Sequence, residues 1–329
     1  MYSWQNSDWP NYEFQTTKHQ PILLRYSEQS GRLAAISELL HAQGIDQADI
    51  ESLVDEAVNT SLIENELLAR DDVRSSIKHF MGLKPEIKNR DQRADGIVAA
   101  LMDLREDVAS PISHGRIKKW HAQVMYGNDS LFQGASVTGE YRVHAEPMQI
   151  VSGPLGRQTV HYEAPPAHQV HEDMSRFITW YNEAGELPAP IRAAVAHLWF
   201  ETIHPFDDGN GRVGRAIAEY ALAQGMGNMP PMSLSLALEK NKDQYYPQLH
   251  EASMGDSLNI DKYVAWFIGQ CTQAQVYAQA RFDMVIVKAE FWRSNTAIVK
   301  DKAQSKVLNR FFDAGINGFV NGLSAQKYA

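Results

Sequence analysis

The sequence has a single cysteine, Cys271, and no surplus of positive charge. One cysteine cannot form an intramolecular disulfide or a zinc cage of thiolates, which favours a reducing compartment. With 31 Lys and Arg against 40 Asp and Glu, the formal net charge is -9, which disfavours a chain whose main task is to hold nucleic acid. We therefore expect no nucleic-acid partner, and we expect Cys271 to be a small core residue.

The sequence also lacks long apolar runs. Residues 1–5 have neither the basic start nor the apolar segment of a signal peptide, and no stretch reaches the length of a membrane span. These absences predict a cytoplasmic protein without a membrane partner. At 329 residues and 44% apolar, the chain can bury a large core, so one compact body with appendages is expected.

Apolar residues recur at helical spacing along most of the chain. Pro10 and Pro21 predict an irregular arm over the first thirty residues, followed by two helices before residue 60, with a stop at Gly44 between them. The expected apolar face of the first helix consists of Leu33, Ile36, Leu39 and Leu40. Further helices are predicted from Asp71 to near Gly82, from Asp91 to Val108, around Ile117 to Met125, and from Pro190 to Ile203.

Helical periodicity is lost between Gly134 and Tyr162, where Gly, Pro and β-branched residues cluster. Residues 148–151 and 159–162 resemble short strands, and residues 152–157 between them have the composition of a turn. This predicts one β-hairpin within an otherwise all-α fold. Its edge could pair with an extended peptide, although the sequence alone favours a plain connecting hairpin.

The most informative stretch runs from His204 to Arg215, between two strongly helical segments. Pro205 ends the first helix, so residues 209–211, Gly-Asn-Gly, lie at the N-terminus of the second. That end of a helix presents unpaired N–H groups and the positive pole of the dipole, and glycine lets a ligand come close. The loop is therefore suited to an anion.

Two arginines follow the glycines. Arg212 and Arg215 share one side of the first turns, although cations there oppose the helix dipole. Two planar guanidinium forks over a nest of N–H groups suit a polyphosphate. Asp208 adds a carboxylate suited to a Mg²⁺ that bridges phosphates, and His204 could take a proton from an attacking hydroxyl.

Other readings of this stretch fit less well. No Gly-Lys-Ser/Thr follows the glycines, and no strand precedes them, which excludes a Walker A loop. His197, Glu201 and His204 are spaced along one helix, but the His-Glu-x-x-His signature of zinc proteases is absent. His197 lies among apolar residues, so we expect it to be a core histidine.

The stretch resembles the signature of the Fic family, His-x-Phe-x-Asp/Glu-Gly-Asn-Gly-Arg-x-x-Arg. Every fixed position is present: His204, Phe206, Asp208, Gly209, Asn210, Gly211, Arg212 and Arg215. The resemblance covers roughly residues 85–285. It implies a mainly helical Fic fold with a small β-hairpin flap, an N-terminal helical region over 1–84, and a catalytic core over 85–285, with flanks similar to one bacterial subgroup.

The resemblance also implies roles for these residues. His204 would be the general base that activates a target hydroxyl for attack on the α-phosphate of ATP, and Asp208 would bind Mg²⁺. Gly209, Asn210 and Gly211 would form an anion hole, Arg212 would grip the β-phosphate and Arg215 the γ-phosphate. Phe206 would anchor the loop, and the hairpin over 148–162 would align a target protein. Asn241 and Tyr245 would line the nucleotide pocket.

A second family feature lies in residues 60–65, Thr-Ser-Leu-Ile-Glu-Asn, which resemble the inhibitory pattern Ser/Thr-x-x-x-Glu-Gly/Asn. The plain alternative is an exposed helical glutamate. If the resemblance holds, Glu64 pairs with Arg215 and occupies the fork intended for the γ-phosphate. ATP would then bind with its α-phosphate turned away from in-line attack, which forfeits the gain from positioning.

The C-terminal segment, residues 286–329, resembles the first helices of a winged helix-turn-helix through Lys306–Phe312, Gly315 and Leu323–Tyr328. No wing follows in the chain as given. A truncated DNA-binding domain and a short helical pack that never contacts DNA are the two interpretations, and we favour the second.

These features together predict an autoinhibited nucleotidyltransferase, a protein adenylyltransferase that moves AMP from ATP onto Ser, Thr or Tyr of a target protein. Self-modification is expected as a side activity, and a homodimer is left open. The alternatives are removal of AMP with the help of Glu64, or a regulatory module that senses nucleotide. The intact His204, Asp208 and both arginines argue against the last.

Overall fold

The computed structural model describes residues 1–42, 47–85, 87, 90–127, 138–152, 157, 159–228, 231–295 and 301–314. This part of the chain is mainly helical with one small sheet, as predicted. The elements up to the sheet are η1 (Ser3–Gln5), η2 (Thr16–His19), α1 (Gln20–Ala42), α2 (Gln47–Ile63), α3 (Arg70–Phe80), α4 (Gln92–Glu106) and α5 (His114–Val124). Those that follow are β1 (Gln149–Ser152), β2 (Thr159–Glu163), α6 (Ala167–Glu183), η3 (Ala184–Glu186), α7 (Ala189–Ile203), α8 (Asn210–Met226), α9 (Leu234–Lys240), α10 (Lys242–Ser253), α11 (Asp261–Asn295) and α12 (Lys302–Ala314).

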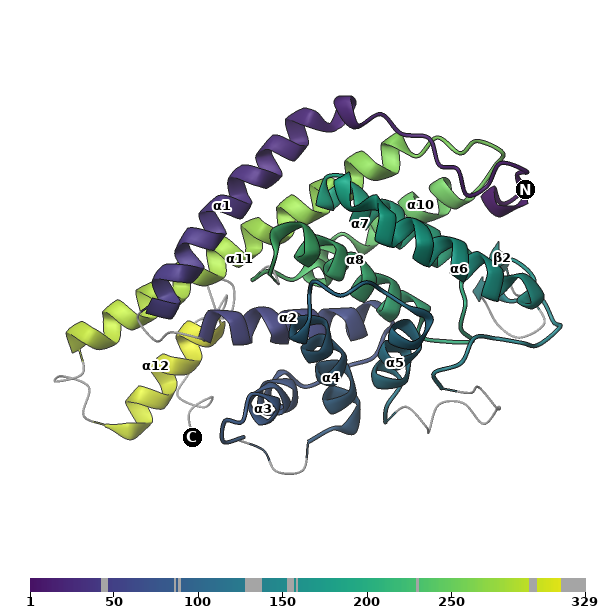
Figure 1. Ribbon diagram of the computed structural model, residues 1–329. Coiled ribbons are helices and arrows are strands. Elements are labelled where there is room, and N and C mark those ends of the chain that lie inside the picture. Colours follow the sequence, from purple (N-terminus) through teal and green to yellow (C-terminus); the bar gives the residue numbers. More distant parts are fainter. Residues whose placement is uncertain are drawn as a thin grey trace.

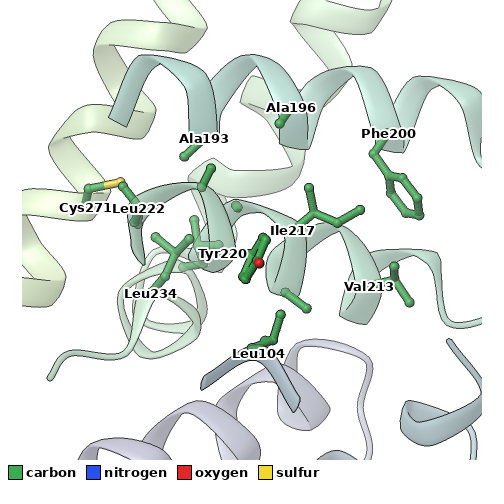
Figure 2. Close-up of a cluster of buried hydrophobic side chains, with 14 of the residues drawn as sticks. Leu104, Ala193, Ala196, Phe200, Val213, Ile217, Tyr220, Leu222, Leu234 and Cys271 are labelled. Atoms are coloured by element: carbon green, nitrogen blue, oxygen red, sulfur yellow. The ribbon is translucent and has the colours of Figure 1, made fainter. Parts of the chain in front are cut away.

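Helices α7 and α8 form the centre of the molecule (Figure 1). Every residue of α7 from Pro190 to Ile203 is buried, so neighbours cover this helix on all sides. In Figure 2, Ala193 and Ala196 of α7 lie toward α8, where Ile217 points back between the helices. Small side chains at this contact let the two helices pack closely, which fixes the ends of the loop that joins them.

Other helices close the core around this pair. Figure 2 shows Leu104 of α4, Leu234 of α9 and Cys271 of α11 converging on α8. Cys271 is fully buried, which confirms the expected core cysteine. Helices α1 and α11 run side by side along one flank, and α2 packs against α3 and α9 (Figure 1).

The predicted arm is only partly irregular, because α1 already begins at Gln20. Pro21 lies in the first turn of this helix, where its missing N–H has no partner to lose, so it opens the helix instead of preventing it. The predicted face is also partly wrong: Leu33 and Leu40 are buried, but Leu39 is 55% exposed. The stop predicted at Gly44 lies outside the described residues.

The remaining arm packs on the molecule through aromatic side chains. Trp9 and Tyr12 both meet the ring of Trp199 on α7 edge-on. The indole N–H of Trp4 donates to the carbonyl of Glu163 at 2.7 Å. The arm therefore supports both α7 and the end of β2.

The hairpin is present as predicted. Strands β1 and β2 are antiparallel, with Ile150 opposite Tyr162 and a register shift before Val151, which is opposite Val160. The hydroxyl of Tyr162 donates to the carbonyl of Thr202 at 2.6 Å and ties the hairpin to the end of α7. Most of the predicted turn, residues 153–156, lies outside the described part of the chain.

The helices predicted over 71–82 and 91–108 are confirmed as α3 and α4. Asp91 is the N-cap of α4, and its carboxylate accepts from the N–H of Arg93 at 2.9 Å. Helix α11 runs without a break through the domain boundary predicted at residue 285. None of the helices in the described ranges has the length and apolar character needed to cross a membrane.

Candidate active site

The loop between α7 and α8, residues 204–209, is built by two left-handed residues. His204 ends α7 at φ 50° and ψ 61°, and Pro205 follows, which has no N–H for another turn. Gly209 then begins α8 with φ 77°, a conformation that costs glycine little. The first N–H groups of α8 therefore face the loop at the positive end of the helix dipole. This confirms the predicted position of the glycines at a helix N-terminus.

The side chain of Asn210 fastens the loop. Its Oδ1 accepts from the N–H of Phe206 at 2.9 Å, and its Nδ2 donates to the carbonyl of the same residue at 2.8 Å. Asn210 is only 2% exposed. An anion at this loop would therefore contact the backbone around Gly209 and Gly211 and not the side-chain amide of Asn210.

His121, a buried histidine of α5, supports the loop through its ring face and both ring nitrogens. Its ring stacks on Phe206 with centroids 3.8 Å apart. Its Nδ1 accepts from the N–H of Gly139 at 2.8 Å, so Nε2 carries the proton and donates to the carbonyl of Asp208 at 3.0 Å. Burial lowers the pKa of His121 to about 4, which keeps the ring neutral in this role.

Asp208 presents a carboxylate at the rim of the loop. Its Oδ1 accepts from the N–H of Gly209 at 2.7 Å, and its Oδ2 lies 4.0 Å from Nη2 of Arg212. The side chain is 37% exposed. No group of three His, Cys, Asp or Glu side chains able to hold a metal occurs in the described part of the chain. This donor set fits Mg²⁺, which is often bound by one carboxylate together with phosphate oxygens and water.

Arg215 is buried at the centre of the site and already holds an anion. Its Nη2 lies 2.8 Å from Oε1 of Glu64, which follows directly on α2. Thr60 accepts from the same guanidinium with Oγ1 at 2.9 Å and with its carbonyl at 2.8 Å. Burial opposes the charge of Arg215, but Glu64, together with Tyr245 and Glu201, raises the pKa of Arg215 above its ordinary value.

Glu64 also occupies space beside the glycines. A Cβ on Gly211 would lie 2.3 Å from Oε1 of Glu64, so a side chain at this position would displace the carboxylate from where it lies. The end of α2 is held from α10, where Lys242 and Tyr246 both donate to the carbonyl of Ile63. The predicted contact between Glu64 and Arg215 is thus present in the structure.

Arg212 is held by a second carboxylate that sequence reasoning missed. Its Nη1 lies 2.9 Å from Oε2 of Glu66, two residues after Glu64. Between them Asn65 takes the left-handed region with φ 62°, which turns both carboxylates toward α8. Both arginines at the start of α8 are therefore paired with carboxylates from one turn.

His204 lies in a buried, electrostatically unusual position. Burial, followed by the positive charge of Arg142, lowers its pKa from 6.5 to about 4. The Nε of Arg142 donates to the carbonyl of His204 at 2.8 Å and so caps the end of α7. The imidazole is therefore neutral near physiological pH and has a free lone pair to accept a proton.

Glu201, one turn before His204, is a second residue that the sequence did not single out as functional. Its Oε2 lies 3.9 Å from Nδ1 of His204, and a Cβ on Gly214 would come within 2.4 Å of its Oε1. Burial raises the pKa of Glu201 from 4.5 to about 8, against the opposing charge of Arg215. This side chain is therefore protonated at neutral pH and lies beside the candidate base.

A model of the Fic/DOC family matches residues 111–222, which include α5, the hairpin, α7, the loop and most of α8. Residues 111–222 form a Fic/DOC family domain. A second model, a domain of unknown function (DUF4172), matches residues 2–83, which include Glu64 and Glu66.

Several curated relatives of the Fic domain are named protein adenylyltransferases. The Caenorhabditis elegans protein adenylyltransferase fic-1 is 35% identical over 98 residues, which cover 29% of this chain and 18% of the relative. Protein adenylyltransferase Fic of Drosophila grimshawi is 25% identical over 297 residues, or 78% of this chain and 59% of the relative. The chain thus spans less than a fifth of the first relative's length.

Solved structures show the same fold. A Fic family protein from Desulfovibrio desulfuricans has a TM-score of 0.58 at 21% identity, covering 97% of this chain and 84% of that one. Fic-1 from C. elegans has a TM-score of 0.57 at 23% identity, covering 80% and 73%. The mainly helical Fic fold predicted from the sequence is therefore confirmed.

Tyr245 and Asn241, which are predicted to line the nucleotide pocket, follow the Fic domain in the sequence. The hydroxyl of Tyr245 bonds to Nε2 of His197 at 2.9 Å, and Tyr263 bonds to the other ring nitrogen at 2.9 Å. This confirms that His197 is a satisfied core histidine. Asn241 donates to Gln270 of α11 and to α9. The roles of Tyr245 and Asn241 toward nucleotide stay predictions.

The support that His121 gives to the Fic loop is open to a stability test. His121→Phe keeps the stack on Phe206 but leaves the Gly139 N–H and the Asp208 carbonyl without partners. We expect the free energy of unfolding to fall by about 1–3 kcal/mol for each group, measured by urea denaturation. His79→Phe, at an exposed position on α3, should change it by less than about 0.5 kcal/mol. Equal losses in the two variants would show that these hydrogen bonds do not hold the loop.

Proposed function

We propose that this chain is a protein adenylyltransferase that transfers AMP from ATP to a hydroxyl side chain of another protein, and that Glu64 holds it in an inhibited state. The observation that carries this proposal is the ion pair between Glu64 and Arg215 inside a complete Fic loop. The names of the curated relatives over the same domain support the class of reaction.

In the proposed reaction, His204 is the general base. The target hydroxyl oxygen attacks the α-phosphorus of ATP, the bond from that phosphorus to the bridging oxygen of the β-phosphate breaks, and pyrophosphate leaves. The proton of the hydroxyl passes to Nε2 of His204, the ring nitrogen other than the one near Glu201. The lowered pKa of His204 ensures that the base is unprotonated at the start.

The phosphates would be held by the first turns of α8. The N–H groups at Gly209 and Gly211 would stabilise charge on the transferred group, Arg212 would bind the β-phosphate and Arg215 the γ-phosphate. Asp208 would hold Mg²⁺, which supplies positive charge between the phosphates. Asn210 contributes by fixing the loop.

The target protein would dock along the hairpin. Ile150, Val151 and Val160 are exposed hydrophobic residues on its two strands. An extended segment that pairs with the edge of this sheet would be fixed by backbone hydrogen bonds, with little demand on its sequence. Because Tyr162 ties the hairpin to the end of α7, a segment bound there lies at a fixed place relative to His204. Self-modification follows if a segment of the chain itself can reach this edge.

Glu64 would inhibit by occupying Arg215. A phosphate oxygen and the Glu64 carboxylate cannot take the same Nη2 at once, and the carboxylate also lies against Gly211. ATP that binds while Glu64 remains in place loses its γ-phosphate anchor, so its α-phosphate is not aligned for attack. Release of Glu64 from Arg215 is then the step that activates the site.

The depressed pKa of His204 predicts an unusual pH dependence. A histidine with the ordinary pKa of 6.5 would become protonated, and lose its function as a base, as pH falls through that value. With a pKa of about 4, His204 stays neutral, so AMP transfer by the Glu64→Gly variant should stay nearly constant from about pH 8 to about pH 5.5. Removal of Glu64 lowers this pKa further. A fall in rate centred near pH 6.5 would contradict the proposed environment of the base.

Mass spectrometry tests the proposed activity. The Glu64→Gly variant is incubated with ATP, Mg²⁺ and a lysate of the source organism, and peptides are searched for an AMP adduct. We expect adducts on Ser, Thr or Tyr that are absent when ATP is omitted. Phosphorylated peptides in place of AMP adducts would show that the Fic domain transfers a different fragment.

A further inference from the structure

The ion pair between Glu66 and Arg212 is not explained by inhibition through Glu64. Oε2 of Glu66 lies 2.9 Å from Nη1 of Arg212, whose side chain is 1% exposed, while that of Glu66 is 14% exposed. The pair lies on the first turn of α8, beside the Asp208 carboxylate. It therefore occupies the part of the proposed site where the β-phosphate would bind.

The pair leaves Arg212 incompletely satisfied and Glu66 in an unfavourable environment for its charge. Nε of Arg212 has no hydrogen-bond partner among the described residues, although it is buried. Burial raises the pKa of Glu66 more than Arg212 lowers it, and the nearby charge of Asp208 adds to the rise. A buried guanidinium with an unused donor is suited to a ligand that offers more oxygens than one carboxylate.

Glu66 and Glu64 are also mechanically linked. They lie on the turn between α2 and α3, and ion pairs outside the site hold these two helices together. Arg70 of α3 bonds to Asp55 of α2 at 2.6 Å, and Arg74 bonds to Glu51 at 2.8 Å. The turn therefore presents both carboxylates to α8 as one unit, one to each arginine.

We propose that Glu66 is a specificity-determining residue that competes with the β-phosphate at Arg212, so that it weakens the binding of nucleoside diphosphates as well as triphosphates to the intact chain. This inference rests on the proposed function, in which Arg212 binds the β-phosphate. Glu64 alone would block only ligands that need Arg215 for a γ-phosphate, and ADP has none. Glu66 weakens the binding of ADP too, whereas AMP needs neither arginine.

The consequence for activation is that removal of Glu64 opens only half of the phosphate site. A nucleotide entering the Glu64→Gly variant must still displace Glu66 from Arg212. Removal of both carboxylates should therefore increase the affinity for ATP beyond that of either single variant. The affinity for ADP should therefore depend mainly on Glu66, whereas the affinity for ATP should depend on both Glu64 and Glu66.

Equilibrium binding of ADP, ATP and AMP in the presence of Mg²⁺ tests this inference, measured by calorimetry on the full chain. We compare wild type, Glu64→Gln, Glu66→Gln and the double variant. We expect Glu66→Gln to increase the affinity for ADP about tenfold or more, because the competing charge-assisted bond is lost. Glu64→Gln should leave the affinity for ADP within about threefold, and AMP should bind all four proteins alike.

The control is Glu28→Gln, which removes an exposed carboxylate that pairs with Arg32 on α1, far along the chain from the loop. It should change no affinity. Thermal unfolding of each variant separates binding from folding: a merely structural Glu66 would lower the midpoint without raising the affinity for ADP, and that result would overturn the inference. If Glu64→Gln gains ATP binding and Glu66→Gln gains none for ADP, only this inference fails. If no variant binds ATP, the proposed function fails with it.

Discussion

Substitution of Glu64 by Gly is expected to raise the rate of AMP transfer by about 10²-fold, because a displaced reacting group can cost that much. In the wild type, Arg215 donates to Glu64 and to Thr60, so its guanidinium has little left for a γ-phosphate. Glycine at position 64 frees Nη2 and the space beside Gly211. The measurement is the initial rate at which label from α-labelled ATP enters protein.

A matched control separates the loss of the carboxylate from the effect of a glycine. Glu28→Gly places the same substitution on an exposed face of α1, where it costs about 1 kcal/mol of stability but does not touch the loop. Its transfer rate should equal that of the wild type. An equal rate for Glu64→Gly and wild type would contradict inhibition by Glu64, whatever the activity of the chain.

Substitution of His204 by Ala in the Glu64→Gly background is expected to lower AMP transfer by about 10²–10⁴-fold, the usual contribution of a general base. Nucleotide binding should remain, because the phosphates would be held by α8 and its two arginines. The rate of label incorporation and the affinity for ATP are measured on the same preparation.

His168→Ala is the matched control for this loss, because His168 is exposed on α6. It should leave the transfer rate of the Glu64→Gly variant unchanged. Loss of ATP binding together with activity in His204→Ala would indicate that His204 shapes the loop and is not the base. Retention of full activity would exclude His204 from proton transfer.

Local sequence patterns predicted much of this structure. The apolar spacing after Asp91 predicts α4, and the Gly-Asn-Gly run after Pro205 predicts a helix N-terminus, because these features act within a few residues. The start of α1 was missed for a local reason as well: Pro21 was interpreted as a helix breaker, although the first turn of a helix accepts proline.

The residues missed at the site act across the fold. His121 meets Asp208 from 87 positions away, and Glu66 meets Arg212 from 146 positions away. The sequence around His121 and Glu66 gives no indication of these long-range contacts. The sequence contained one signal for Glu66. Glu64 and Glu66 are two residues apart, and Arg212 and Arg215 are three residues apart, so a carboxylate that pairs with Arg215 has a second carboxylate near Arg212. Glu201 could have been flagged as an acid one turn before the candidate base.

The most direct test of AMP transfer under the control of Glu64 compares α-labelled with γ-labelled ATP. Each is incubated with Mg²⁺, a lysate of the source organism, and either wild type, Glu64→Gly or Glu64→Gly with His204→Ala. The account predicts strong protein labelling from α-labelled ATP with Glu64→Gly, weak labelling with wild type, none with the double variant, and none from γ-labelled ATP that depends on the added protein. Label that enters protein from the γ-phosphate, or no α-label in any sample while ATP still binds, would contradict it.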